Sequence, residues 1–218
     1  MINLFLYFHH ISSLDTKNGI MARFYKLGKV NINVSGSSTQ YINGSRQLTK
    51  PSYAVDQVDK TYDWCSNCGR TPEEQPWIVF SIKDSPLLIS GYYLKVGCCR
   101  YNGCCCEELG YCSRCCLYSW AFQISDDAKN WKEVHRVEKD IKAEYCAERQ
   151  YDFKQAYKAK FFRLIQTEAC PGDPPCLSLN KFEMFGDING EDASYIVYDE
   201  NEEDDVSIIG HVSKDNKI

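Results

Sequence analysis

The sequence predicts an all-β protein with the strands of an antiparallel sandwich or barrel. Aromatic residues make up 13% of the 218 residues, with 15 Tyr and 10 Phe, and such rings suit the half-buried surface of a sheet. Several segments alternate apolar and polar side chains with the period of two that is typical of strands. Turn sequences rich in Asp, Asn, Ser and Pro separate these segments. We therefore expect many short strands and no long helix.

The first 28 residues form a lead-in segment ahead of the alternating pattern. Asp15 is placed to cap one or two helical turns. Such a helix would present Ile20, Phe24 and Leu27 on one face. We therefore expect a short lead-in helix over part of residues 1–28.

Eight later segments are expected to be strands, and they place the domain at residues 29–187. The first of them, Val30–Val34, alternates strictly between apolar and polar residues. The turn residues Lys83–Pro86 predict a hairpin, and Ser125–Asn130 predict a turn that links Ile124 to Trp131. The expected strands are residues 30–34, 77–82, 88–96, 117–124, 131–137, 151–153, 161–167 and 177–185. Strands at this spacing predict a sandwich or barrel.

Charge is unevenly distributed along the chain. Residues 187–218 hold ten acidic residues and two lysines, whereas the other residues hold 20 acidic and 23 basic ones, a net charge of +3. A body this close to neutral lacks the basic field that phosphate binding needs, so we expect no nucleic-acid partner. Residues 188–218 have too few apolar side chains to offset the entropy of ordering, so we expect a disordered acidic tail. The longest apolar run, residues 4–8, is too short for a membrane span.

The chain contains 13 cysteines, and eight of them lie between residues 98 and 116. In an antiparallel sandwich successive strands reverse direction, so the connecting loops alternate between two poles. If the turn Lys83–Pro86 lies at one pole, every cysteine-bearing segment lies at the other. We therefore expect all the cysteines at one end of the sandwich.

Three chemical states of these cysteines are open. Cys65, Cys68, Cys112 and Cys115 form two pairs whose spacing would let four thiolates hold a structural zinc, although 43 residues separate the pairs. Disulfides would instead staple a long insert that cannot build a core of its own. The third state is reduced thiols that behave as small apolar side chains, and this is the state that we expect.

The compartment follows from the same residues. The N-terminus has no basic n-region and no clear cleavage site, and the cysteine count is odd, which favours a reducing, cytoplasmic location. Two glycosylation-type triplets, Asn33-Val34-Ser35 and Asn43-Gly44-Ser45, favour the alternative of secretion or the cell surface.

Several segments together resemble the factor V/VIII type C, or discoidin-like, domain. The segments that resemble its strands and turns are residues 77–82, 89–94, 119–131, 161–167 and 179–186. The lead-in Asn18-Gly19-Ile20 also resembles versions that protozoa such as trichomonads attach behind BTB domains, but this chain contains no BTB domain.

The resemblance implies an eight-stranded antiparallel jelly roll of the galactose-binding-like class, which binds a carbohydrate, lipid headgroup or protein without catalysis. Many members of the family tie their two ends with a disulfide, and this chain has no cysteine before Cys65 or after Cys176 to do so. The family's ligand loops lie opposite the chain termini. The pole that carries the cysteines is therefore the expected recognition surface.

The candidate ligand-binding residues supply hydrogen-bond donors, acceptors and flat rings, the groups that hold sugars and peptides. They come from the cysteine-rich insert and from one earlier loop: Asp63, Trp64, Arg100, Tyr101, Asn102, Glu107, Glu108, Tyr111 and Arg114. The alternatives are a Trp64 ring packed under its loop, and arginines that are simply solvated.

Catalytic chemistry is not indicated. The four histidines lie in the lead-in, one strand and the tail, without a nucleophile beside them, and no glycine-rich phosphate loop occurs. We expect a non-catalytic module that binds a carbohydrate or protein partner, with no cofactor other than the zinc considered above. Two alternatives stay open: a metal-binding or thiol-redox protein that uses the sandwich as a scaffold, and a structural adaptor fragment.

Overall fold

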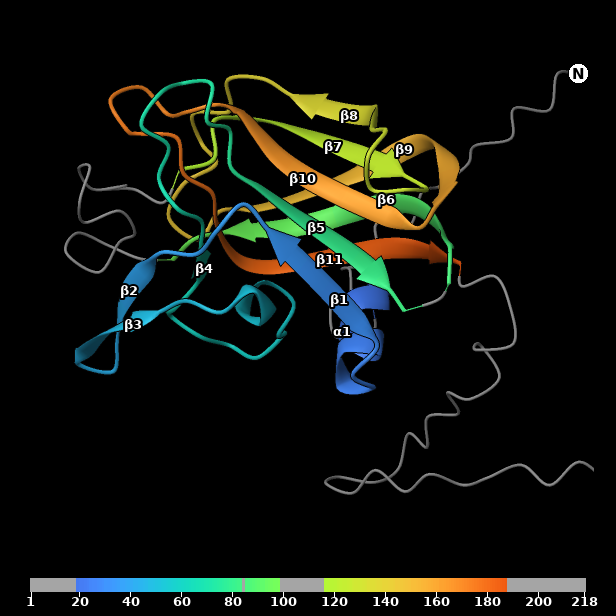
Figure 1. Cartoon of the computed structure of the whole chain (residues 1–218), viewed down its shortest axis with the longest axis horizontal. Coiled ribbons are helices and arrows are strands. Elements are labelled where there is room, and N and C mark those ends of the chain that lie inside the picture. Colours follow the sequence, from blue (N-terminus) through green and yellow to red (C-terminus); the bar gives the residue numbers. More distant parts are fainter. Residues whose placement is uncertain (1–18, 84, 99–115, 188–218) are drawn as a thin grey trace, which may run out of the picture.

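Two antiparallel sheets pack face to face in this protein (Figure 1). The computed structural model describes residues 19–83, 85–98 and 116–187. The five-stranded sheet has the order β1 (Val30–Val34), β5 (Trp77–Ile82), β10 (Phe161–Glu168), β7 (Ser119–Ser125) and β8 (Lys132–Val137). The four-stranded sheet has the order β4 (Trp64–Cys65), β11 (Ser178–Asp187), β6 (Leu87–Val96) and β9 (Glu148–Ala159). The predicted antiparallel sandwich is confirmed.

Each of the eight predicted strands is present, and β9 is much longer than the expected residues 151–153. The sequence did not predict β4 or the hairpin of β2 (Thr39–Ile42) and β3 (Ser45–Leu48). A 3-10 helix, η2 (Pro51–Ala54), follows that hairpin. These additional elements are only two or four residues long, and the β3 side chains are largely exposed, so their apolar periodicity is weak.

The predicted hairpin between β5 and β6 is wrong. Strand β5 pairs with β1 and β10, whereas β6 pairs with β11 and β9. Both edges of each strand are therefore occupied by partners distant in sequence, and the link between β5 and β6 crosses from one sheet to the other. The predicted turn between β7 and β8 is present, and the two strands that it joins pair as a hairpin.

Aromatic rings from the two sheets form the core. Phe80 of β5 stacks on Phe182 of β11, with ring centroids 4.3 Å apart, and Tyr92 of β6 stacks on Phe122 of β7 at 4.7 Å. Offset stacked rings add specific contact energy to the apolar area that they bury. Aromatic side chains thus form contacts between the two sheets.

The helix α1 (Ile20–Lys26) packs against β11 and adds Ile20, Met21 and Phe24 to the same core. Leu27 was expected on that buried face, but 53% of its surface is exposed. The helix ends at Lys26, and Leu27 occupies the C-cap position, where it no longer follows the helical face. The expected cap, Asp15, and the acidic tail, residues 188–218, lie outside the described residues.

A buried carboxylate fixes the start of α1. Glu183 accepts hydrogen bonds from the backbone N–H groups of Met21, at 2.6 Å, and Ala22, at 2.9 Å. These donors have no partner inside the helix, so the carboxylate satisfies them. Gly19 lies so close that a Cβ there would overlap the Glu183 side chain. Burial raises the Glu183 pKa to about 7, against the opposing effect of its backbone hydrogen bonds.

Candidate functional site

Seven cysteines of the described chain gather at one end of the sandwich, which we call the cysteine pole. They are Cys65, Cys68, Cys98, Cys116, Cys146, Cys170 and Cys176. Disulfides join Cys98 to Cys146 and Cys116 to Cys170, across 48 and 54 residues of sequence. Cys65 of β4 lies opposite Ser178 of β11 in the strand register. The prediction that the loops alternate between two poles is confirmed for these cysteines.

Backbone hydrogen bonds join the same loops. Gly69 N–H donates to Pro175 O at 2.8 Å, and Cys146 N–H donates to Gly97 O at 2.9 Å. Leu117 N–H donates to Ala143 O at 2.8 Å. Segments that are far apart in sequence are thus tied to one another by backbone as well as by sulfur, which restricts their independent motion.

Asp63 anchors the base of this pole. It has no exposed surface, and both of its carboxylate oxygens lie 2.9 Å from Cys98 N–H. Gln40 and Asn180 donate side-chain N–H groups to the same carboxylate at 2.9 and 3.0 Å. One buried acid thereby joins three segments, and its hydrogen bonds offset the free-energy cost of burial.

Trp64 is also fully buried, and its indole N–H donates to Ser37 Oγ at 3.0 Å. The atoms of Asp63 and Trp64 are therefore out of reach of a ligand on the surface, and both residues support the loops from below. The other seven candidate ligand-binding residues lie outside the described residues: Arg100, Tyr101, Asn102, Glu107, Glu108, Tyr111 and Arg114.

The expectation of reduced thiols is wrong for the six described cysteines that are disulfide-bonded. Cys65 and Cys68 are among them. A sulfur in a disulfide cannot act as a thiolate ligand, so this pair does not offer the two thiolates that a zinc cage needs. Cys112 and Cys115 lie outside the described residues. Elsewhere in the described ranges, no three His, Cys, Asp or Glu residues are grouped to hold a metal ion.

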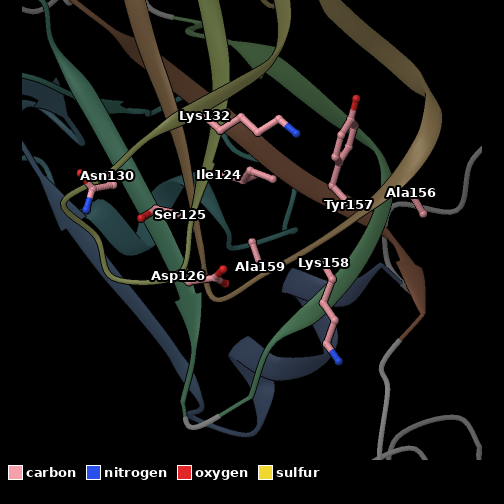
Figure 2. Close-up of a pocket in the computed structure, with 9 residues that line it drawn as sticks. All are labelled: Ile124, Ser125, Asp126, Asn130, Lys132, Ala156, Tyr157, Lys158 and Ala159. Carbon is pink, nitrogen blue, oxygen red and sulfur yellow. The ribbon is translucent and has the colours of Figure 1, made fainter.

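The opposite end, which we call the turn pole, contains an open hollow of about 340 Å³ (Figure 2). It lies between the β7–β8 turn and the end of β9, so each sheet supplies one wall. Ile124 and Ala159 are apolar lining residues, and Lys132, Asp126 and Tyr157 add charge and a ring. Figure 2 shows the Lys132 side chain directed toward Tyr157, and its ammonium lies 5.7 Å from the ring centroid.

Asp127 holds the turn beside this hollow by local bonds. Its carboxylate accepts hydrogen bonds from the backbone N–H groups of Lys129 and Asn130, each at 2.8 Å, and from Ser125 Oγ at 2.9 Å. These donors favour the charged form, so the Asp127 pKa lies well below its usual range, with the Asn130 N–H as the largest cause. The Asp127 carboxylate thus shapes the mouth of the hollow through bonds to residues two or three positions away, and Lys160 N–H, which donates to Ser125 O at 3.2 Å, adds one bond distant in sequence.

Between the poles, a chain of polar groups links the fully buried Trp120 and Tyr92 to the half-buried His135. The Trp120 indole N–H donates to the Tyr92 hydroxyl at 2.9 Å, and that hydroxyl lies 2.9 Å from His135 Nδ1. Burial lowers the His135 pKa, so the ring favours its neutral form. A neutral imidazole can accept the Tyr92 proton, which completes the chain without a charge. These hydrogen bonds join β6, β7 and β8 through their side chains.

Solved structures of two modules from Clostridium perfringens are similar to this chain. One is CpGH89CBM32-5 in complex with GalNAc-β-1,3-galactose, at 13% identity and a TM-score of 0.50, covering 73% of this chain and 96% of the module. The other is CBM32-3 of a family 31 glycoside hydrolase, at 14% identity and a TM-score of 0.50, covering 73% and 92%. The chain shares the galactose-binding-like fold of these CBM32 modules. Neither a family model nor a curated protein matches the sequence.

The CBM32 fold is the one that the discoidin-like resemblance implied, because CBM32 modules are themselves domains of that class. Sequence reasoning missed the hollow of the turn pole, although it identified the β7–β8 turn. The position of Tyr157 opposite that turn depends on the pairing of β9 with β6, from Leu87 to Lys95, and no local pattern indicates this pairing. Among the described helices, none is long and apolar enough to cross a membrane.

Proposed function

We propose that this protein is a non-catalytic recognition module that binds a carbohydrate through loops of the cysteine pole. The observation that carries the proposal is the covalent joining of loops from distant parts of the chain, through Cys98–Cys146 and Cys116–Cys170. Loops fixed on a rigid sandwich lose little conformational entropy when a ligand binds, which favours affinity.

The chemistry of the candidate residues supports a sugar ligand. Tyr101 and Tyr111 supply flat rings, and Arg100 and Arg114 supply donors for hydroxyl groups. The structure of the similar module CpGH89CBM32-5 from Clostridium perfringens was solved with GalNAc-β-1,3-galactose. A disaccharide of galactose and N-acetylgalactosamine is therefore the first probe to use.

The disulfides also favour an oxidising compartment, because such bonds persist mainly in secreted proteins and cell-surface domains. We accordingly place the protein outside the reducing cytoplasm, at the alternative location that the triplets Asn33-Val34-Ser35 and Asn43-Gly44-Ser45 favour. Purification without reductant followed by a count of reactive thiols tests this placement. Full reactivity of all 13 cysteines in the native protein would contradict it.

The test of ligand binding compares the two poles. The oxidised protein is applied to a glycan array and titrated with GalNAc-β-1,3-galactose by calorimetry. Replacing Arg100, Tyr101 and Tyr111 by Ala should weaken binding by at least about tenfold, because anchor residues of this type carry most of a binding energy. The matched control replaces Lys132 and Tyr157 by Ala in the hollow of the turn pole, and it should bind as the parent does.

Each outcome of this comparison decides one question. Loss of binding in the control variant alone would move the site to the hollow. The absence of any bound glycan on the array would overturn the carbohydrate proposal. In each case an unchanged melting temperature shows that the variant is folded.

A further inference from the structure

The β2–β3 hairpin carries one of the two glycosylation-type triplets at its tip. Ile42 pairs with Ser45, so Asn43 and Gly44 are the two turn residues between the strands. Both have positive φ angles, of 51° and 82°. Asn-Gly is the preferred pair for such a two-residue turn, because both positions need the left-handed conformation. The triplet Asn43-Gly44-Ser45 is therefore built into the sharpest surface turn of the hairpin.

This tip faces open solvent. All three residues of the triplet are exposed, and a Cβ placed on Gly44 would have no atom within 4 Å. Figure 1 shows the hairpin extending away from the two main sheets. A large polar group attached to the Asn43 side chain would therefore displace no packed atom of the described protein.

The second triplet, Asn33-Val34-Ser35, lies in a different environment. Asn33 belongs to β1 and pairs with Val79 of β5. Ser35 Oγ accepts a hydrogen bond from Trp77 N–H at 3.1 Å, across 42 residues of sequence. The Ser45 hydroxyl, in contrast, bonds only within its own hairpin, to Ile42 O and Gln47 Nε2. Asn33 and Ser35 are also exposed, but their triplet is held in an extended strand that pairs with β5, whereas the Asn43 triplet forms a free-standing turn.

The disulfides supply an independent observation on the compartment. Disulfides such as Cys98–Cys146 and Cys116–Cys170 form and persist mainly in oxidising environments, and the lumen of the secretory pathway is one of these. Asn-x-Ser triplets receive N-linked oligosaccharides in secreted proteins, and surface loops are the usual acceptors. From these observations we infer that Asn43 is an acceptor for an N-linked oligosaccharide, and that Asn33 is not.

Transfer of the oligosaccharide to Asn43 is a substitution at an anomeric carbon. A bond forms between Asn43 Nδ2 and the anomeric carbon of an oligosaccharide donated by a lipid pyrophosphate. The bond from that carbon to the pyrophosphate oxygen breaks, the lipid pyrophosphate leaves with the electron pair, and the proton lost from the amide nitrogen ends on that pyrophosphate or in the solvent. No group is oxidised or reduced. The product places a hydrophilic chain beside Tyr41, a ring that is 56% exposed on the same hairpin.

The test is secretion of the full chain from eukaryotic cells behind a heterologous signal peptide, followed by intact mass measurement with and without peptide N-glycosidase. We expect one oligosaccharide per chain. Asn43→Gln and Ser45→Ala should each remove it completely, Ser45→Thr should retain it, and Asn33→Gln should leave it unchanged. Both triplets fall in one tryptic peptide, residues 30–46, so the variants are needed to assign the site.

An oligosaccharide that persists in Asn43→Gln and disappears in Asn33→Gln would overturn the assignment. Secretion of an oxidised, folded chain without any oligosaccharide would also overturn it. Asn43 has a positive φ angle that favours Asn over Gln, so a cooperative thermal unfolding transition must show that the secreted Asn43→Gln chain is folded, with the enzymatically deglycosylated parent as the reference. A second arm examines the protein from the organism that makes it, where the peptide of residues 30–46 should carry hexose and N-acetylhexosamine mass on Asn43.

Discussion

The two poles of the sandwich are held by different kinds of contact. At the cysteine pole, disulfides span 48 and 54 residues, and Asp63 joins Cys98 to Asn180. At the turn pole, Asp127 bonds only to residues two or three positions away. The first set of contacts removes conformational freedom from a large part of the unfolded chain, whereas the second shapes a single turn.

The comparison distinguishes long-range contacts, which determine stability, from local contacts, which determine only local shape. A contact between distant segments is lost when the chain unfolds globally, and its loss frees long stretches of backbone. A local turn can persist in part in the unfolded chain, so it contributes little to the free-energy difference. We therefore expect effects on stability to fall in order from covalent long-range contacts, through buried long-range ones, to local ones.

The largest effect is expected from removal of a disulfide. Replacing Cys98 and Cys146 together by Ala should lower the free energy of unfolding by about 4 kcal/mol, since the bond closes a loop of roughly 50 residues. Urea unfolding without reductant measures the change. Hydrogen exchange should show faster exchange of the Cys146 amide position, whereas Lys160 N–H at the turn pole should keep its protection.

A matched control tests whether the effect is covalent. The parent protein in strong reductant should lose at least as much stability as the double variant, whereas the double variant should lose less on reduction than the parent does. Equal unfolding midpoints for the oxidised and the reduced parent would show that the disulfides do not hold the cysteine pole.

The second effect concerns Glu183, which joins β11 to α1 across 162 residues. Its pKa is 4.5 in the unfolded chain and about 7 in the folded protein, because burial disfavours the charge. The folded protein therefore binds a proton that the unfolded chain releases between these two values. The group's contribution to stability is complete below pH 4.5 and declines by about 3 kcal/mol as the pH rises to 7.

Urea unfolding from pH 4 to pH 8 measures this slope. Glu183→Gln should be less stable, because its amide NH₂ faces backbone donors, and it should lack the decline between pH 4.5 and 7. Asp127 and Asp140 have lowered pKa values, so their contributions change only below this range. The lowered pKa of His135 makes its contribution rise with pH inside the range, but it does so in the parent and in Glu183→Gln alike, so the difference between the two proteins reports Glu183. The same slope in the parent and in Glu183→Gln would contradict the assignment.

Much of the fold could be predicted from the sequence, because strand alternation and turn residues are local signals. Val30–Val34 and the β7–β8 hairpin are examples. Pairing is not a local signal, and so the assumed hairpin of β5 with β6 failed. Glu183 illustrates the same limit, since it has the appearance of an ordinary strand residue and its partners in α1 are 161 and 162 positions away.

The candidate site divides in the same way. Counting strand reversals correctly predicted that the described cysteines share one pole. Each strand of the predicted series runs opposite to the one before it, so the order of a loop along the chain indicates its pole. The oxidation state was predicted wrongly, since it depends on the distance between sulfur atoms such as those of Cys116 and Cys170. Trp64 is buried, and it lies opposite Leu179 of β11. Burial of this ring was one of two alternatives that the sequence left open.

The third effect lies in the core between the poles. Tyr92→Phe removes the acceptor of the fully buried Trp120 N–H and the partner of His135. An unsatisfied buried donor costs about 1–3 kcal/mol, so the free energy of unfolding should fall by that amount. Tyr41→Phe, at a ring that is 56% exposed, is the control and should change stability little. A Tyr92→Phe variant as stable as this control would show that the buried chain contributes nothing.

The smallest effect is expected from Asp127→Ala at the turn pole. Its carboxylate is solvent-exposed and its donors are local, so only a small decrease in melting temperature should follow. The pKa of Asp127 is lowered, so its stabilising effect is present above pH 3.8 and is lost as the pH falls below that value. The neighbouring exposed carboxylate in Asp126→Ala is the control, and it should show neither change. If Asp127→Ala destabilised the protein as much as the loss of Cys98–Cys146, local and long-range contacts would be equivalent here, and the contrast between the poles would fail.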